Sequence, residues 1–200
     1  MMDIRKVTAM TAIDLSAAFD TVDHDILLDV LENDFGVGGT VYKWCDSYLR
    51  PRKMKVCVNG AYSEDKDLNF SVPQGSCAGP VLYNAYASTM SKVVDEFENT
   101  NVTGYADDHS LYKSFDPDPE SENSAIEMLE LCLAKIKLWM QENRLKMNTD
   151  KTEFIYFGTS VQLAKSLVNE IKVENDTVSK EEKIKYLDAI LDSQLTLVEQ

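Results

Sequence analysis

Two adjacent carboxylates, Asp107 and Asp108, follow a short β-prone stretch at residues 101–105. Neighbouring side chains of a strand point to opposite faces, so both acids can face one site only if the chain turns there. Two carboxylates at a hairpin tip suit a divalent cation, because Mg²⁺ is usually held by one or two carboxylates together with substrate phosphates. Asp-Asp is also common in ordinary turns, so the pair by itself leaves that reading open.

A third acid, Asp14, ends an apolar run at residues 7–13, and a turn of small residues then leads to a helix start. A strand-end Asp also fits a helix cap or a solvated loop residue. Between Asp14 and the Asp pair lies a loop punctuated by Gly and Pro, residues 71–80, which opens a helix. Acids that end two distant strands predict that these strands are neighbours whose ends meet.

Five segments resemble, in order, the motifs of a reverse transcriptase of the LINE-like, non-LTR retrotransposon kind. IDLSAAFDTVDH (13–24) is similar to motif A, SVPQGSCAGP (71–80) to motif B and YADD (105–108) to motif C. WMQENRLKMNTDKTEFIYFG (139–158) resembles motif D with its following strand, and KYLDAILDSQLTL (185–197) resembles the motif E region. Because these segments cover nearly the whole chain, residues 1–200 are identified as a partial reverse transcriptase domain.

The hydrophobic pattern predicts strands that alternate with long helices. Strands are expected at residues 5–13, 101–105, 154–157, 170–173 and 184–191. Helices are expected at residues 23–35 and 39–49 and from residue 80 onward, and a separate long helix is expected after the loop at residues 116–119, ending near residue 144. Asn59-Gly60 predicts a hairpin turn. Such an order indicates an α+β fold, an antiparallel sheet with helices packed on one face. The resemblance implies the palm of a right-hand polymerase.

The resemblance implies an RNA-directed DNA polymerase, a nucleotidyltransferase that uses two Mg²⁺ ions, with Mn²⁺ as a substitute. It assigns the metals to Asp14, Asp107 and Asp108 and to the main-chain carbonyl of Leu15. Two ions about 4 Å apart activate the attacking primer 3′-hydroxyl and neutralise the triphosphate and the leaving oxygen. We therefore expect the three carboxylates to converge within about 4 to 7 Å.

The same resemblance implies a nucleotide-binding and primer-binding set around these acids. Phe19 matches the bulky residue under the sugar, and Gln74 and Gly75 match positions that line the incoming nucleotide. Tyr105 matches the aromatic residue beside the primer end, and Lys151 lies where the family places a lysine that acts as a general acid. From the residues alone, Phe19 also fits a core position, Tyr105 an ordinary strand residue and Lys151 the surface. His24 and His109 are interpreted as structural or solvated.

Composition indicates a globular chain, since 44% of its 200 residues are hydrophobic. No apolar run approaches the length of a membrane span. Four scattered cysteines predict free, mostly buried thiols in a reducing compartment. If the chain is part of an active retrotransposon, the nucleus or the cytoplasm is expected. The net charge of −14 is unusual for a nucleic-acid binder, and the only basic cluster is Arg50, Arg52, Lys53 and Lys55.

In its full-length context such a domain is expected to engage an RNA template, a DNA primer and deoxynucleoside triphosphates, with no membrane. The chain starts shortly before motif A and stops just after motif E, so fingers, thumb and endonuclease are expected to be missing and the fragment alone inactive. The alternative is a truncated, catalytically inactive retroelement remnant that acts at most as a protein-interaction module. An unrelated Mg²⁺ enzyme such as a nucleotide cyclase is disfavoured by motifs B and D.

Overall fold

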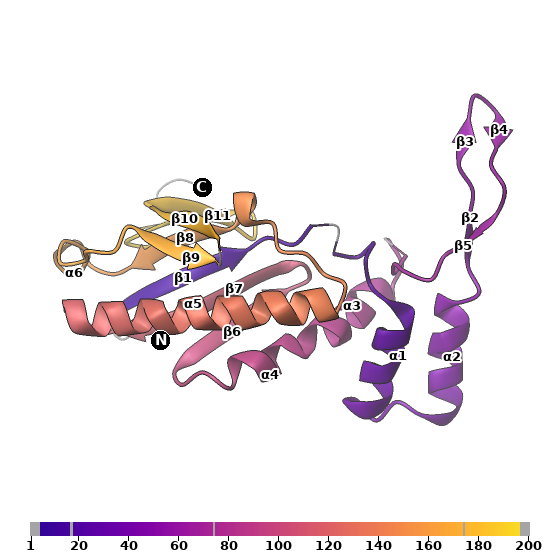
Figure 1. The fold of residues 1–200 in the computed structure, drawn as a ribbon, viewed down its shortest axis with the longest axis horizontal. Helices are drawn as coiled ribbons and strands as arrows, with labels where there is room; N and C mark the ends of the chain where they lie inside the picture. Colours follow the sequence, from indigo (N-terminus) through magenta and orange to yellow (C-terminus); the bar gives the residue numbers. More distant parts are fainter. Residues whose placement is uncertain (1–4, 17, 74, 174, 197–200) are drawn as a thin grey trace. The chain divides into compact units, whose positions relative to one another are not determined.

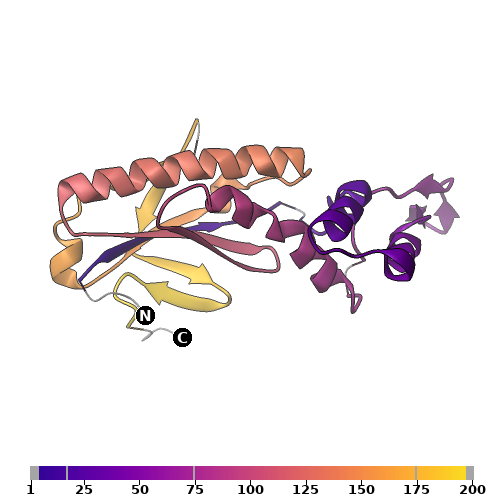
Figure 2. The same cartoon turned by 90° about the horizontal axis from the view of Figure 1, so that it is seen from below.

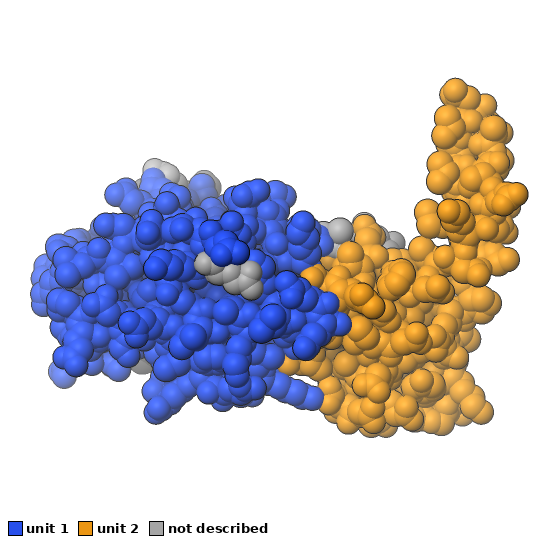
Figure 3. All heavy atoms as spheres, viewed as in Figure 1, with its two compact units in different colours: residues 1–16, 90–142, 146–200 blue, residues 17–89, 143–145 orange. Residues whose placement is uncertain are grey.

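The structure is a computed structural model that describes residues 5–16, 18–73, 75–173 and 175–196. The chain forms two compact units, which Figure 3 shows in different colours. The first unit contains residues 1–16, 90–142 and 146–200, and the second contains residues 17–89 and 143–145. The three acids of motifs A and C therefore belong to the first unit, whereas Phe19 and the motif B loop belong to the second.

A six-stranded sheet forms the centre of the first unit, in the order β6-β7-β1-β8-β10-β9 (Figure 1). Its strands are β1 (Val7–Ile13), β6 (Thr100–Tyr105), β7 (Asp108–Phe115), β8 (Glu153–Phe157), β9 (Glu170–Val173) and β10 (Asp176–Glu181). β1 lies inside the sheet, antiparallel to β7 on one side and to β8 on the other. Its apolar side chains are largely buried, which explains its nearly continuous apolar sequence. One pair, β8 with β10, is parallel.

Helix α5 (Pro119–Glu142) covers one face of this sheet, as Figure 2 shows. It contacts β7 and β9, and the short helix α4 (Met90–Val94) packs against α5 and β6. One side of α5 is apolar and buried, namely Ile126, Leu129, Leu133, Ile136 and Met140. Helices on one face of a mainly antiparallel sheet confirm the predicted α+β fold.

A separate hairpin, β11 (Lys183–Tyr186) with β12 (Ala189–Asp192), packs on the sheet through Ile184, which joins Met10 and Ile155 in a buried cluster. The prediction of one strand over residues 184–191 is therefore wrong. The chain turns at Leu187 and Asp188, which have left-handed φ values of +49° and +62°. Asp tolerates this conformation better than most residues, so the turn forms at Asp188.

The described residues of the second unit form three helices and a long hairpin. They are α1 (His24–Asn33), α2 (Gly39–Leu49), α3 (Gly79–Ser88) and the short strands β2 (Lys53–Met54), β3 (Cys57–Val58), β4 (Ala61–Tyr62) and β5 (Lys66–Asp67). β3 pairs with β4 around Asn59 and Gly60, both of which have positive φ, as the Asn-Gly signal predicted.

The first unit further includes the 3₁₀ turn η1 (Thr149–Lys151) and the one-turn helix α6 (Ser160–Leu163).

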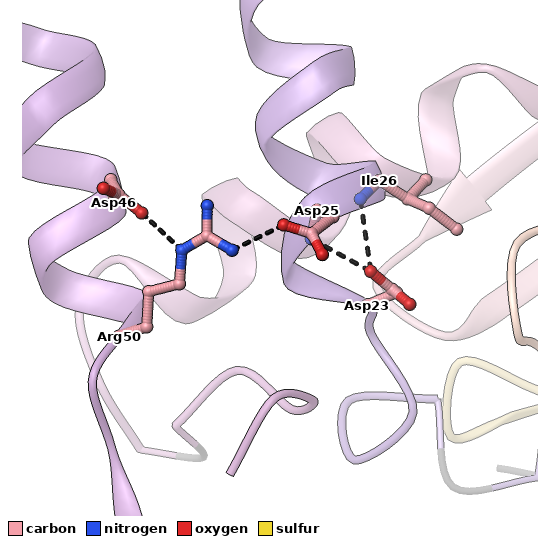
Figure 4. Close-up of polar contacts among 5 residues, drawn as sticks. All are labelled: Asp23, Asp25, Ile26, Asp46 and Arg50. Atoms are coloured by element: carbon pink, nitrogen blue, oxygen red, sulfur yellow. Dashed lines mark hydrogen bonds and ion pairs between the residues drawn. The ribbon is translucent and has the colours of Figure 1, made fainter. Parts of the chain in front are cut away.

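Arg50 ties α1 to α2 in the second unit, as Figure 4 shows. Its guanidinium donates to the carboxylates of Asp46 in α2 and Asp25 in the first turn of α1. These two partners raise the pKa of Arg50 above its ordinary value. Asp23, which precedes the helix, caps α1 by accepting from the backbone amides of Asp25 and Ile26. Asp23 is therefore the N-cap residue of α1.

All four cysteines are free thiols, as predicted. Only Cys45 and Cys132 are buried, whereas Cys57 and Cys77 are exposed, so the expectation that most would be buried holds for half of them. Within the described part of the chain, no helix combines the length and the apolar character needed to cross a membrane.

Candidate active site

Asp14 and Asp108 meet where β1 ends and β7 begins. Ile13, the last residue of β1, pairs with His109 of β7, and the same antiparallel register carried one residue further sets Asp14 opposite Asp108. Both acids line one open pocket of about 340 Å³, together with Lys151. The acids of these two segments do lie at meeting strand ends, but the strand beside β1 is β7, which Asp108 begins. The prediction that the strand at residues 101–105 is the neighbour of β1 is wrong, because β6 pairs with β7 instead.

Asp107 lies in the two-residue loop between β6 and β7. The loop is Ala106-Asp107, and Tyr105 pairs with Asp108 across it. Ala106 has a left-handed φ of +54°, which reverses the chain within two residues. The sequence argument required a turn between the two acids, and the hairpin supplies it.

The side chain of His109 braces this hairpin. The ring is 6% exposed, and its Nδ1 lies 3.1 Å from the main-chain oxygen of Asp107. Because a carbonyl only accepts, Nδ1 carries the proton in this bond. The ring packs against Gly104, its partner across the hairpin, so closely that a Cβ at residue 104 would lie 2.9 Å from ring atoms Cδ2 and Nε2. His109 is therefore structural, and glycine at position 104 makes room for it.

We expect Gly104→Ala to displace the His109 ring and to break its bond to the Asp107 carbonyl. Because the ring is buried, the overpacking should lower the free energy of unfolding by about 1–3 kcal/mol. Urea unfolding of the two proteins measures this difference. The double variant Gly104→Ala/His109→Ala should recover part of it, because the colliding ring is gone. Equal stability of Gly104→Ala and the wild type would contradict the close packing described here.

The acids affect one another electrostatically. Partial burial raises the pKa of Asp108 above its ordinary value, and the negative charges of Asp107 and Asp14 raise it further. Burial likewise lowers the pKa of His109, although the Asp107 carbonyl and the neighbouring acids oppose this. Like charges held close together are unfavourable in themselves, and a bound divalent cation relieves that repulsion.

Motif D is attached to the end of β1. The backbone amide of Asn148 donates to the carbonyl of Asp14 over 2.9 Å, and the amide of Ser16 donates to the carbonyl of Lys146 over 2.9 Å. These bonds flank Leu15, whose own carbonyl takes part in neither of them. The 3₁₀ turn η1 follows directly, and this attachment explains why Lys151 lines the pocket of Asp14.

The β11–β12 hairpin contributes residues that sequence reasoning did not single out. Lys185 lines the pocket of Asp14 and Asp108, and it also lines a second pocket of about 340 Å³ with Asp108 and Tyr105. Its ammonium pairs with Asp188 at 2.9 Å, which raises the pKa of Lys185. The resemblance to motif E covers this segment, but it does not single out Lys185 as a site residue. Three further lining residues were also missed, Asp150, Glu153 and Tyr186.

The other proposed site residues lie in the second unit. The ring of Phe19 stacks on that of Tyr83, with centroids 4.5 Å apart and an angle of 21° between the planes. Phe19 is half-buried, which fits a core position as well as a sugar-facing one. Gly75 is exposed, with a left-handed φ of +78° that explains the glycine. Gln74 lies outside the described residues.

The donors in the first pocket suit a hard divalent cation. Asp14 and Asp108 both line it, and partial burial together with the neighbouring negative charges raises the pKa of Asp108. Mg²⁺ needs only one or two protein carboxylates when substrate phosphates complete its shell. Among the described side chains, no three acids, histidines or cysteines are grouped as a preformed metal site. The three-carboxylate arrangement with Asp107 thus stays a prediction.

Comparison with known proteins identifies the family of this chain. Residues 1–191 match the family described as reverse transcriptase (RNA-dependent DNA polymerase). The chain is 29% identical over 188 residues to the probable RNA-directed DNA polymerase from transposon BS of Drosophila melanogaster, covering 92% of this chain and 20% of that protein. It is 28% identical over 201 residues to the RNA-directed DNA polymerase from mobile element jockey of the same species, covering 98% and 21%.

Solved telomerase structures share the fold. Apo telomerase from Candida tropicalis, truncated from its C-terminal domain, matches 96% of this chain with a TM-score of 0.61 at 16% identity, over 35% of that structure's chain. Telomerase from the same species with a TWJ fragment of telomeric RNA matches 98% of this chain with a TM-score of 0.65 at 14% identity, over 30% of that structure's chain. These likenesses support the predicted palm architecture.

The fold and the motif order thus define a polymerase palm. The chain belongs to the reverse transcriptase family, the RNA-directed DNA polymerases, which are nucleotidyltransferases that generally use divalent metal ions. The resemblance to the enzymes of LINE-like, non-LTR retrotransposons is confirmed by its mobile-element relatives. The chain spans about a fifth of the length of these relatives.

Proposed function

We propose that this chain carries the active centre of a retrotransposon polymerase that extends a DNA primer with deoxynucleoside triphosphates on an RNA template. The observation that carries the proposal is the meeting of Asp14 and Asp108 at the ends of β1 and β7, in a pocket shared with Lys151. Family membership supplies the reaction class.

The acids of motifs A and C are the metal-binding groups of this proposal. Asp14, Asp107 and Asp108, with the carbonyl of Leu15, would hold two divalent ions, Mg²⁺ or its substitute Mn²⁺. When bound, such ions activate the primer 3′-hydroxyl and neutralise charge on the triphosphate and the leaving oxygen. The raised pKa of Asp108 fits this role, since its causes include the negative charges of Asp107 and Asp14 that a cation would offset.

Residues around the acids would position the reactants. Lys151 lies in the pocket with Asp14, where its ammonium is suited to protonate the departing pyrophosphate. Tyr105, exposed and opposite Asp108 across the hairpin, is suited to contact the primer end. Phe19, Gln74 and Gly75 would form the nucleotide-binding set.

Primer extension tests the proposal. The longest reading frame that contains this chain should extend a DNA primer on an RNA template when Mg²⁺ is present, and extension should stop when the metal is chelated. Asp107→Asn should remove the activity. If extension is absent, or equal in wild type and variant, the alternative of a catalytically inactive remnant is favoured.

We expect Phe19→Ala to admit ribonucleotides. The Phe19 ring would clash with a 2′-hydroxyl, and its removal leaves space for that group. The measurement is the ratio of kcat/KM for a deoxynucleotide to that for the matching ribonucleotide, which should fall by about 10-fold or more. Tyr83→Phe is the control, because it keeps the ring that stacks on Phe19. An unchanged ratio would assign Phe19 to core packing instead.

A further inference from the structure

Ser71, at the entrance of the motif B loop, has an unusual backbone conformation. Its φ is +80°, in the left-handed region that residues other than glycine rarely adopt. Two backbone bonds tie this point to motif A, because the amide of Ser71 donates to the carbonyl of Val22 and the amide of Val72 donates to that of Phe19, each over 2.9 Å. A strained conformation persists only where its surroundings hold it.

The carbonyl of Ser71 is held by a buried histidine. Nε2 of His24 lies 2.8 Å from this oxygen, and Nη1 of Arg52 donates to it over a longer 3.4 Å. The His24 side chain is 1% exposed, and its Nδ1 has no hydrogen-bond partner among the described residues. Because the carbonyl only accepts, Nε2 carries the proton. Among the described residues, the ring therefore makes its hydrogen bond to Ser71 alone.

The far end of the loop is held as firmly. The hydroxyl of Ser76 donates to the carbonyl of Pro73 over 2.7 Å and accepts from the amide of Gly79 over 3.0 Å. A Cβ at residue 79 would lie 2.9 Å from the Ser76 hydroxyl and 3.0 Å from the Pro73 carbonyl, so this end is closely packed. Between the two ends lies Gly75, which is exposed.

We propose that His24 is a positioning residue for the motif B loop, assisted by Arg52. The bond from His24 to Ser71 stabilises the left-handed conformation at which the loop begins, and it thereby sets the place of Gly75. The inference rests on the proposed function, in which Gly75 lines the incoming nucleotide. Loss of the bond lets Ser71 relax toward an ordinary φ, which displaces the start of the loop.

The first test measures the loop itself in the 200-residue chain. His24→Leu should raise the hydrogen-exchange rate of the amides at residues 71–79 by roughly fivefold to tenfold, the effect of losing one hydrogen bond. His24→Gln retains a donor at the same reach and should restore most of the protection. Adding Ser71→Gly to His24→Leu should also restore it, because glycine adopts a positive φ without strain. This double variant also serves if His24→Leu alone does not fold.

Arg50 supplies the matched control for Arg52. Arg50→Ala breaks the contacts to Asp25 and Asp46 but removes no group from Ser71, so exchange at residues 71–79 should stay at the wild-type rate. Arg52→Ala should raise it, by less than His24→Leu does. Wild-type exchange rates in His24→Leu would overturn the proposal.

The second test asks whether the loop serves the nucleotide. In primer extension by the longest reading frame, His24→Leu should raise KM for the deoxynucleotide by roughly fivefold to tenfold while kcat stays within about twofold, since uniform binding is lost. His24→Gln should rescue KM. Faster exchange with an unchanged KM would overturn the positioning role. An inactive wild type would count against the proposed function instead. The exchange test alone would then decide whether His24 holds the motif B loop in place.

Discussion

Replacing Asp14 by asparagine should lower Mg²⁺-dependent primer extension by about 10²- to 10³-fold or more, the loss typical of one group that stabilises charge in a transition state. Asparagine keeps the shape of the side chain but removes the charge that a divalent cation requires. Asp14 also shares its pocket with Asp108, whose pKa is raised in part by the Asp14 charge. The measurement is the initial rate of extension at saturating Mg²⁺.

The control for this variant is Asp95→Asn, which makes the same chemical change at an exposed residue just after α4. Its extension rate should equal that of the wild type. Binding of Mn²⁺ to the purified 200-residue chain, followed by electron paramagnetic resonance, gives a readout independent of polymerisation. Asp14→Asn should weaken this binding. Wild-type extension by Asp14→Asn would remove Asp14 from the metal site.

Glu122→Leu should lower the free energy of unfolding by about 3–5 kcal/mol, because three hydrogen bonds to one charged acceptor are lost together. Glu122 lies in α5 and is 2% exposed. Its carboxylate accepts from the hydroxyl of Ser166 at 2.6 Å and from the amides of Leu167 at 2.9 Å and Val168 at 3.1 Å. Leucine would leave these three part-buried donors without their acceptor. Chemical denaturation measures the difference.

The same carboxylate makes stability depend on pH. Burial opposes its charged form, but the bonds from Ser166, Leu167 and Val168 outweigh burial and lower the pKa of Glu122 below its ordinary 4.5. A depressed folded-state pKa adds stability above the unfolded value, and this stability is lost as pH falls through the folded value. We therefore expect Tm to fall on acidification below about pH 4.5, and Glu122→Gln to flatten that part of the curve.

Glu120 provides the control for both measurements, because it is exposed in the same first turn of α5. Glu120→Leu and Glu120→Gln should each change stability by no more than about 0.5 kcal/mol, as is usual for surface substitutions. Equal stability losses at positions 120 and 122 would show that the hydrogen bonds of Glu122 contribute nothing to the fold.

Sequence patterns within a few residues were enough to predict much of the local structure of this chain. The bounds predicted for α2, residues 39–49, agree with the structure because Gly precedes the helix and Pro follows it. Asn59-Gly60 predicted its hairpin because both residues tolerate positive φ. The acids of the YADD segment were placed at a turn by the alternation of side chains in a strand. Each of these features is decided within a few residues.

Tertiary packing decided the rest. β10 pairs antiparallel with β9, which directly precedes it along the chain. It also pairs in parallel with the more distant β8, and no local pattern predicts that second pairing. Lys185 reaches the pocket of Asp14 only because Ile184 anchors its hairpin on the sheet. His24 reads as an isolated histidine in sequence, and its bond to Ser71 joins residues 47 positions apart. Such contacts depend on which surfaces the whole chain buries together. Sequence patterns therefore predicted the candidate acids, whereas the tertiary structure determined which residues lie beside them.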